Sequence, residues 1–266
     1  MQISHPQTEY QGIAPENVFF VTDDRQIQTG TGYVVRFMQG ELYPERPLHL
    51  FLQLDTKPSA RALMFGALLA RADQLRAEMP DRPARLYTQA DPNDRELLQF
   101  YETCGMRNDD GEDRYRFPLP TANLQPPIGM QFNTVPLMDE NSRDQFLYRL
   151  NQYRIPPFTR DYLTFWEQQP HFMAMGFYRN NRPVCETIIT GGGDTATLLM
   201  IYTDAQYRRQ GLAGKLLSCV STYLQEQGVK YMYAHVFRRN AAQNGLMRHL
   251  GAALMGTVTA LPGMDL

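Results

Sequence analysis

A glycine-containing turn at the start of a helix is the part of the sequence best suited to bind an anion. Residues 201–217 read as a buried strand, a short turn and a helix that opens with Gly211-Leu-Ala-Gly214. The first amides of a helix have no partner within the helix, and the helix dipole adds partial positive charge there. Because Arg208 and Arg209 flank the turn, it is a candidate phosphate or pyrophosphate site. Judged by its glycines alone, the turn is more simply a loop before an ordinary core helix.

The residues around this turn resemble the GCN5-related N-acetyltransferases, the GNAT superfamily. The run RRQGLA at 208–213 fits the Q/R-x-x-G-x-G/A element with which this family holds the pyrophosphate of acetyl-CoA. Tyr207 before the run and Lys215-Leu-Leu217 after it are also similar to the family. Asn240 stands eleven residues before Gly251, which is the family's spacing between its asparagine and the glycine that closes its last helix. The resemblance covers the whole second half of the chain.

The resemblance implies that acetyl-CoA is the cosubstrate and that the amides of residues 209–214 receive its pyrophosphate. It also implies that backbone groups of Ile201 and Thr203 pair with the pantetheine arm, in a splayed gap beside the strand at 230–236. An amide of the 201–203 strand would polarise the thioester carbonyl, as an oxyanion-stabilising group does. The expected cofactor-binding residues are Ile201, Thr203, Arg208, Arg209, Gln210, Gly211, Leu212, Ala213, Gly214, Lys215, Asn240 and Asn244. No metal ligands are expected.

The sequence leaves the general base and the general acid open. Candidates for taking a proton from an acceptor ammonium are Glu186, His235 and Tyr202. Glu186 stands among apolar residues, where a carboxylate is costly to bury without a use or a partner, and its alternative is an outward-facing strand position. His235 alternates with Tyr233 along its strand, and its alternative is a structural histidine in the core or at the surface. The family often has a tyrosine acid seven residues after its asparagine, but Met247 stands there and cannot donate a proton.

The second half has the element order of the GNAT family. Strands are predicted at 130–135, 171–178, 183–190, 196–203, 230–236 and 252–259, and helices at 139–150, 159–168, 211–227 and 241–250. Antiparallel hairpins come first and helical crossovers follow, so a mixed sheet covered on both faces is expected. The proline-rich segment 117–129 separates this half from the first and reads as a linker.

The first half repeats the later part of this order. Its strands are predicted at 18–22, 33–38, 49–54, 85–88 and 114–117, and its helices at 59–78 and 94–104. Ala62, Met64 and Phe65 stand where the second half has the small residues 211, 213 and 214, while Tyr101 occupies the family's general-acid position. We therefore predict an α/β (α+β) fold with two GNAT-like domains, each a mixed central sheet flanked by helices. The domains are expected at 1–120, a degenerate copy that does not bind acetyl-CoA, and at 121–266.

Composition narrows the classes of partner. The 266 residues contain 26 Lys+Arg against 28 Asp+Glu, a net charge of −2, so the basic excess of a nucleic-acid binder is missing. Three cysteines without a CxxC pair argue against a disulfide framework or a zinc site and favour a reducing cytoplasm. The first residues do not read as a signal peptide, and no apolar run is long enough to span a membrane. We expect a cytoplasmic protein without nucleic-acid or membrane partners, and a homodimer is left open.

Together these residues predict an N-acetyltransferase. The expected reaction is direct attack of a primary amine on acetyl-CoA, because no cysteine or serine is placed for a covalent intermediate. The acceptor is a small-molecule amine, a peptide N-terminus or a lysine. The alternative is a non-catalytic acyl-CoA sensor or interaction module, which Met247 and the degenerate first copy favour.

Overall fold

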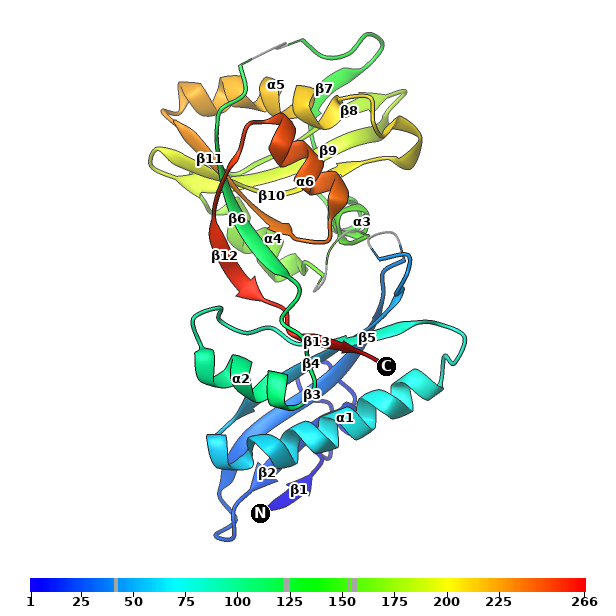
Figure 1. Ribbon diagram of the computed structural model, residues 1–266. Helices are drawn as coiled ribbons and strands as arrows, with labels where there is room; N and C mark the ends of the chain where they lie inside the picture. Colours follow the sequence, from blue (N-terminus) through cyan, green and yellow to red (C-terminus); the bar gives the residue numbers. More distant parts are fainter. Residues whose placement is uncertain (41–42, 122–124, 153, 155–156) are drawn as a thin grey trace. The chain divides into compact units, whose positions relative to one another are not determined.

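The computed structural model describes residues 1–40, 43–121, 125–152, 154 and 157–266, and the chain divides into two compact units (Figure 1). The first unit comprises Met1–Gly111 and Thr259–Leu266, and the second comprises Glu112–Val258. Each unit has a mixed central sheet with flanking helices, which confirms the predicted fold class. None of the helices in the described ranges has both the length and the apolar character needed to cross a membrane.

Six strands form the sheet of the first unit, in the order β1-β2-β3-β4-β5-β13. Their bounds are β1 Gln2–Ser4, β2 Val18–Thr22, β3 Gln28–Met38, β4 Leu48–Thr56, β5 Ala84–Tyr87 and β13 Gly263–Asp265. β4 and β5 are parallel, and the other neighbouring strands are antiparallel. Helices α1 (Arg61–Ala77) and α2 (Arg95–Thr103) share one apolar cluster with β2, β3, β4 and β5. Short 3₁₀ turns at Pro15–Asn17 and Pro58–Ala60 precede β2 and α1.

Seven strands form the sheet of the second unit, in the order β12-β6-β11-β10-β9-β8-β7. Their bounds are β6 Gly111–Pro118, β7 Gln131–Thr134, β8 Met173–Arg179, β9 Arg182–Gly192, β10 Thr195–Thr203, β11 Tyr231–Phe237 and β12 Ala253–Ala260. The helices are α3 Glu140–Asn151, α4 Arg160–Glu167, α5 Leu212–Glu226 and α6 Ala241–His249, with a 3₁₀ turn at Ala205–Tyr207. β10 and β11 are parallel, as a helical crossover through α5 requires.

Each face of the second sheet is covered by its own pair of helices. α5 and α6 pack on one face, over a cluster that includes Phe177, Leu198 and Met232. α3 and α4 pack on the other face, where Ile188 and Met200 are buried. The side chains of Asp139 and Thr159 cap the amino ends of α3 and α4. These two layers leave the parallel strands β10 and β11 at the centre of the unit.

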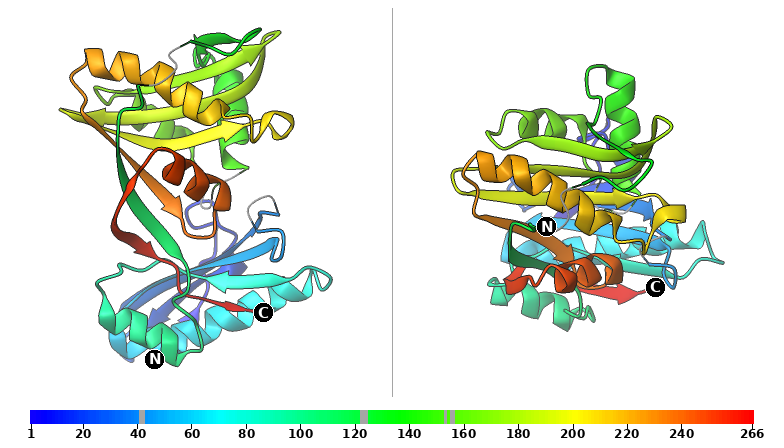
Figure 2. Two further views of the ribbon diagram at one scale, coloured as in Figure 1. Left: turned by 45° about the horizontal axis from the view of Figure 1, so that its top comes forward. Right: turned by 90° about the horizontal axis from the view of Figure 1, so that it is seen from above.

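Strand β6 lies in the second sheet, although its residues directly follow the first unit in sequence. β6 runs between β12 and β11 in the views of Figures 1 and 2, and it pairs antiparallel with β11 from Glu112 opposite Phe237 to Pro118 opposite Tyr231. The strand predicted at 114–117 therefore exists, but it belongs to the sheet of the other copy. β13 at the end of the chain lies beside β5 in the first sheet. The compact units thus divide at residues 111/112 and 258/259 rather than at the expected position near 120.

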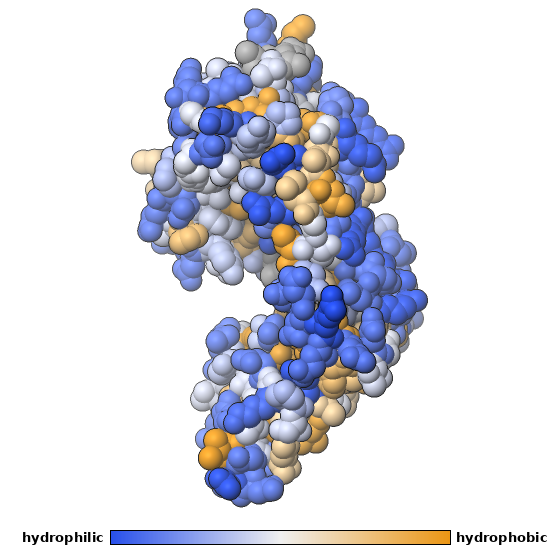
Figure 3. All heavy atoms as spheres, turned by 60° about the vertical axis from the view of Figure 1, so that its left-hand side comes forward, coloured by the Kyte–Doolittle hydropathy of each residue, from blue (hydrophilic) through white to orange (hydrophobic). Residues whose placement is uncertain are grey.

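Surface polarity follows the usual distribution. On the face drawn in Figure 3, hydrophilic residues cover most of the surface and apolar residues form smaller areas between them.

The three cysteines, Cys104, Cys185 and Cys219, are free thiols.

Candidate active site

Strands β10 and β11 are paired over only part of their length. The parallel pairing runs from Thr195 to Leu198 opposite Tyr231 to Ala234, although the strands continue to Thr203 and Phe237. The register between β10 and β9 shifts between Leu198 and Met200, which makes Leu199 a β-bulge. A bulge bends its strand and increases the local twist, so β10 turns away from β11 at this point. The splayed gap predicted beside β11 is therefore present.

The bulge also changes which side chains face which helices. Leu198 packs in the cluster beneath α5, whereas Met200, two residues later, packs beneath α3 and α4. In a regular strand these two residues would point to the same face. The bulge thus reorients every side chain of β10 that follows it.

Backbone groups of Ile201 and Thr203 point toward the gap. The amide of Asp204 donates to the Val184 carbonyl on the β9 side, at 2.9 Å. Peptide groups alternate in direction along a strand, so the carbonyl of Thr203 and the polar groups of Ile201 point away from β9. The Thr203 carbonyl accepts a hydrogen bond from Arg208 Nε at 3.2 Å. Both residues lie where the sequence predicts contacts with pantetheine.

The amino end of α5 is open to solvent. Gly211 is its N-cap, with φ +74° and no side-chain cap, and a Cβ atom added there would meet nothing within 4 Å. The residues before it, 208–210, are exposed, and Arg209 also has a positive φ of 60°. Because the N-cap Gly211 has no side chain with which to satisfy the first amides of the helix, these amides are available to an anion. The residues present therefore fit a pyrophosphate.

The predicted cradle residues lie together on this one turn. Arg208, Arg209, Gln210 and Gly211 are exposed, and Ala213, Gly214 and Lys215 are half-buried. Leu212 instead points into the core beneath α5, so only its backbone amide is available. These positions agree with a cradle built from backbone amides.

Asn240 and Asn244 hold the turn between β11 and α6. Asn240 is only 6% exposed and caps α6, since its Oδ1 accepts from the Gln243 amide at 3.0 Å. Nδ2 of Asn244 lies within 3.1 Å of three backbone carbonyls of this turn, and its Oδ1 accepts from the Tyr115 hydroxyl at 3.2 Å. Both amides thus have structural partners, and their predicted contacts with the cofactor stay a prediction. Nε2 of Gln243 lies 3.6 Å from the sulfur of Met200 on β10, across the gap, and no sequence signal pointed to this residue.

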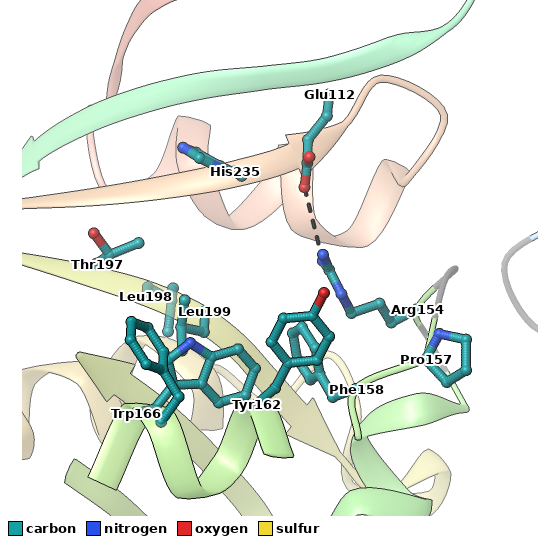
Figure 4. Close-up of a pocket in the computed structure, with 11 residues that line it drawn as sticks. Glu112, Arg154, Pro157, Phe158, Tyr162, Trp166, Thr197, Leu198, Leu199 and His235 are labelled. Atoms are coloured by element: carbon teal, nitrogen blue, oxygen red, sulfur yellow. Dashed lines mark ion pairs between the residues drawn. The ribbon is translucent and has the colours of Figure 1, made fainter. Parts of the chain in front are cut away.

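A cavity of about 250 Å³ lies on the α4 side of the sheet, at the point where β10 and β11 separate (Figure 4). Its walls come from β6, the segment before α4, α4 itself, β10 and β11. The lining residues are Glu112, Arg154, Pro157, Phe158, Tyr162, Phe165, Trp166, Thr197, Leu198, Leu199 and His235. The cavity therefore contacts both the bulge and the first residue of β11 beyond the paired region.

Aromatic rings form one wall of this cavity. The Phe158 ring meets Trp166 edge-on at 4.6 Å between centroids, and Tyr162 stacks on Trp166 at 5.7 Å. The Arg154 guanidinium lies 4.2 Å above the Phe158 ring and 3.7 Å from a Glu112 carboxylate oxygen. The sequence pattern did not place Glu112 in this site.

Of the three predicted bases, only His235 lines the cavity. Its side chain remains accessible, but the cavity walls reduce its hydration. This desolvation lowers the pKa of His235; Glu112 opposes the shift, and Arg114 and Arg154 add to it. The imidazole is therefore neutral at pH 7 and able to accept a proton.

Glu186 and Tyr202 lie in the interior instead. Glu186 has no exposed surface, and its carboxylate accepts from Arg149 Nε at 2.6 Å, from Arg149 Nη2 at 2.9 Å and from the Tyr178 hydroxyl at 3.0 Å. Burial, followed by the Glu186 charge and its hydrogen bond, raises the pKa of Tyr178. Tyr202 belongs to the buried cluster beneath α3 and α4. Their catalytic roles stay predictions, and their burial argues for assigning the base elsewhere.

The positions expected to lack function have structural explanations. Met247 is 2% exposed and packs in the core with α5, so this position holds no proton donor. In the first unit, Met64 and Phe65 are buried in the core beneath α1, where the second unit has its cradle. Tyr101 is 1% exposed in the same core, and burial raises its pKa. The prediction that the first copy does not bind acetyl-CoA is untested, but its cradle space is filled.

In the second unit, a bulged and splayed parallel strand pair leads into an open helix end. Residues 132–252 match the family model described as "Acetyltransferase (GNAT) family", and this part of the chain is a domain of that family. No curated protein is significantly similar in sequence to the chain.

Solved structures share the fold of both units at low sequence identity. A GCN5-related N-acetyltransferase from Sphaerobacter thermophilus is 15% identical with a TM-score of 0.52, over 96% of this chain and 82% of that one. A conserved protein of Enterococcus faecalis V583, described as a probable N-acyltransferase, is 12% identical with a TM-score of 0.60, over 92% of this chain. A GCN5-related N-acetyltransferase from Anabaena variabilis is 14% identical with a TM-score of 0.56, over 95% of this chain. The chain spans 61% and 63% of the last two proteins.

These likenesses establish the fold rather than the substrate. Because each covers more than nine-tenths of this chain, the two mixed sheets are two GNAT-like domains. The resemblance deduced from the residues at 208–213 is thereby confirmed.

Proposed function

We propose that the second unit transfers an acetyl group from acetyl-CoA to a primary amine. The observation that carries this proposal is the connection of the splayed β10–β11 gap to the open amino end of α5, through only the short segment 204–211. A long ligand with a pyrophosphate at one end and a thioester at the other fits this path. The adjoining cavity then receives the acceptor.

One set of residues binds acetyl-CoA, and another polarises its thioester carbonyl. The amides after Gly211, with Arg208, Arg209, Gln210 and Lys215 around them, hold the pyrophosphate, and Ile201 and Thr203 pair with pantetheine through their backbones. When bound, acetyl-CoA supplies an activated thioester carbonyl. An amide of the β10 segment 201–203 stabilises the negative charge that develops on the carbonyl oxygen.

His235 acts as the general base. It is neutral at pH 7, it lies where the strands separate, and it lines the cavity in which the amine is held. It removes a proton from the acceptor ammonium, directly or through a water, so that the amine attacks the carbonyl. Attack is direct, since the residues lining the described cavity include neither cysteine nor serine. The leaving thiolate is stable enough to depart without a protein acid, and Met247 supplies none.

A non-catalytic acyl-CoA sensor is the second candidate, and the buried Met247 is the observation that favours it.

The expected location in the cytoplasm and the open question of a homodimer stay predictions.

Release of free coenzyme A separates the two candidates. The purified chain is incubated with acetyl-CoA and a panel of primary amines, and thiol release is followed against amine-free controls. We expect amine-dependent release that Gly211→Glu abolishes, because a carboxylate at this left-handed position repels the pyrophosphate. Ala62→Glu, at the exposed equivalent position of the first copy, is the matched control and retains activity. Tight binding of acetyl-CoA without release from any amine would support the sensor.

A further inference from the structure

The sheet face beside the cavity is open and positively charged. Side chains alternate along β6 and β11, so Arg114 and Arg116 lie on the same face as the cavity residue Glu112. Both arginines are exposed. On the neighbouring strand, Tyr231 and Tyr233 share the face with His235 for the same reason.

The arginines are held against these tyrosines. The Arg114 guanidinium lies 4.0 Å from the centroid of the Tyr233 ring, and that of Arg116 lies 5.0 Å from the Tyr231 ring. Stacking on an aromatic ring orients a guanidinium while its N–H groups stay free for an anion. Arg114 stands directly opposite His235 in the ladder, so this row of charge begins at the proposed base.

The charges around the cavity are unbalanced toward positive. Arg154 lies inside the cavity, and Arg114 and Arg116 lie next to it, whereas among the lining residues described only Glu112 carries a negative charge. That carboxylate is already paired with Arg154. The neighbouring acid Asp113 points to the opposite face, where Arg238 binds it at 3.1 Å. An acceptor with several positive charges therefore meets repulsion, and an anionic acceptor meets attraction.

The cavity itself favours an apolar group. Its aromatic wall and its volume of about 250 Å³ suit one ring-sized substituent rather than a long chain. We propose that the acceptor is a primary amine that carries an aromatic or bulky apolar group beside the amine and negative charge further along. The apolar group fills the aromatic cavity, and the negative charge meets Arg114 and Arg116. This inference rests on the proposed transfer function.

The residues on this side of the cavity come from the part of the chain that precedes the linker. Glu112, Arg114 and Arg116 all lie on β6, which precedes the proline-rich linker in sequence. The part of the chain assigned to the degenerate copy therefore supplies the residues that select the acceptor.

Four tripeptides with comparable N-terminal amines test the inference: Phe-Glu-Glu, Phe-Ala-Ala, Phe-Lys-Lys and Ala-Glu-Glu. The readout is kcat/KM for coenzyme A release with the full chain at low salt. We expect Phe-Glu-Glu to exceed Phe-Ala-Ala by about tenfold, with Phe-Lys-Lys below both, because this is the size of effect that two exposed charge pairs contribute together. Ala-Glu-Glu is slower than Phe-Glu-Glu, since it leaves the aromatic cavity empty.

Variants assign the preference to the proposed residues. Arg114→Ser/Arg116→Ser abolishes the preference, so that kcat/KM for Phe-Glu-Glu falls to the value for Phe-Ala-Ala with the same variant. Arg114→Lys/Arg116→Lys keeps most of the preference because the charge remains, and Arg182→Ser, an exposed arginine on the β8–β9 hairpin, leaves it intact. Equal kcat/KM for the three Phe peptides overturns the inference and leaves the transfer function standing. Acetyl-CoA binding without release from any amine overturns both.

Discussion

His235 and Glu186 are both ionisable strand residues, but their surroundings suit them to different work. His235 is accessible from the cavity and neutral at pH 7, so it can exchange a proton with a bound amine. Glu186 is fully buried, and its carboxylate accepts hydrogen bonds from Arg149 and Tyr178. A buried and fully paired carboxylate stabilises its neighbours and cannot take a proton from a substrate without breaking these bonds.

The pH dependence of kcat tests the role of His235. Because its pKa is lowered below 6.5, the imidazole is neutral at pH 7 and becomes protonated only as the pH falls. We expect kcat to be constant near pH 7 and to fall below an apparent pKa under 6.5. His235→Ala lowers the plateau by about 100-fold, the lower limit for a general base, and removes the inflection. An unchanged profile in His235→Ala contradicts the assignment.

Unfolding in urea tests the role of Arg149. Arg149→Met leaves the Glu186 carboxylate buried without its partner, so we expect a loss of about 3–5 kcal/mol in the free energy of unfolding. Arg149→Met/Glu186→Leu recovers most of this loss, because no charge is then buried. If Arg149→Met instead left stability unchanged and reduced kcat, the pair would belong to the reaction.

At the scale of elements, sequence patterns predicted the helices and strands better than the contacts that these elements make. The small residues at the start of α5 were visible in the sequence, and both α5 and its open amino end are present. The bulge at Leu199 was not visible in the sequence. Leu199 stands in an apolar run, so the pattern of apolar residues looks the same whichever face of the sheet each side chain occupies. The asparagines 240 and 244 were placed correctly before and within α6, but a sequence does not show that backbone carbonyls occupy their amides.

Asn244 provides the test at this scale. Asn244→Leu removes its hydrogen bonds to the β11–α6 turn, and we expect a loss of about 2–3 kcal/mol in the free energy of unfolding. Affinity for acetyl-CoA, measured by calorimetry below the unfolding transition, changes little if the role is structural. A large loss of affinity with unchanged stability would instead support the cofactor contact predicted from the family.

At the scale of the whole molecule, two GNAT-like domains exchange their closing strands. β6 enters the second sheet and β13 enters the first, so neither sheet is complete without residues from the other side of the linker. The repeat was predictable from element order. The exchange was not, because the alternation of Asp113, Tyr115 and Phe117 specifies one buried face and carries no information about which sheet buries it.

Division of the chain at residue 120 tests this exchange. Residues 121–266 alone lack β6, which exposes the edges of β11 and β12, and we expect this fragment to aggregate or remain unfolded. Co-expression with residues 1–120 restores a folded complex that binds acetyl-CoA. A stable monomeric 121–266 fragment with full affinity would contradict the need for β6.

We propose that the chain has one acetyl-CoA site, at the amino end of α5. Isothermal titration calorimetry with acetyl-CoA tests it most directly. We predict a stoichiometry of one per chain, loss of binding in Gly211→Glu and unchanged binding in Ala62→Glu. A stoichiometry of two, or full affinity in Gly211→Glu, would contradict it.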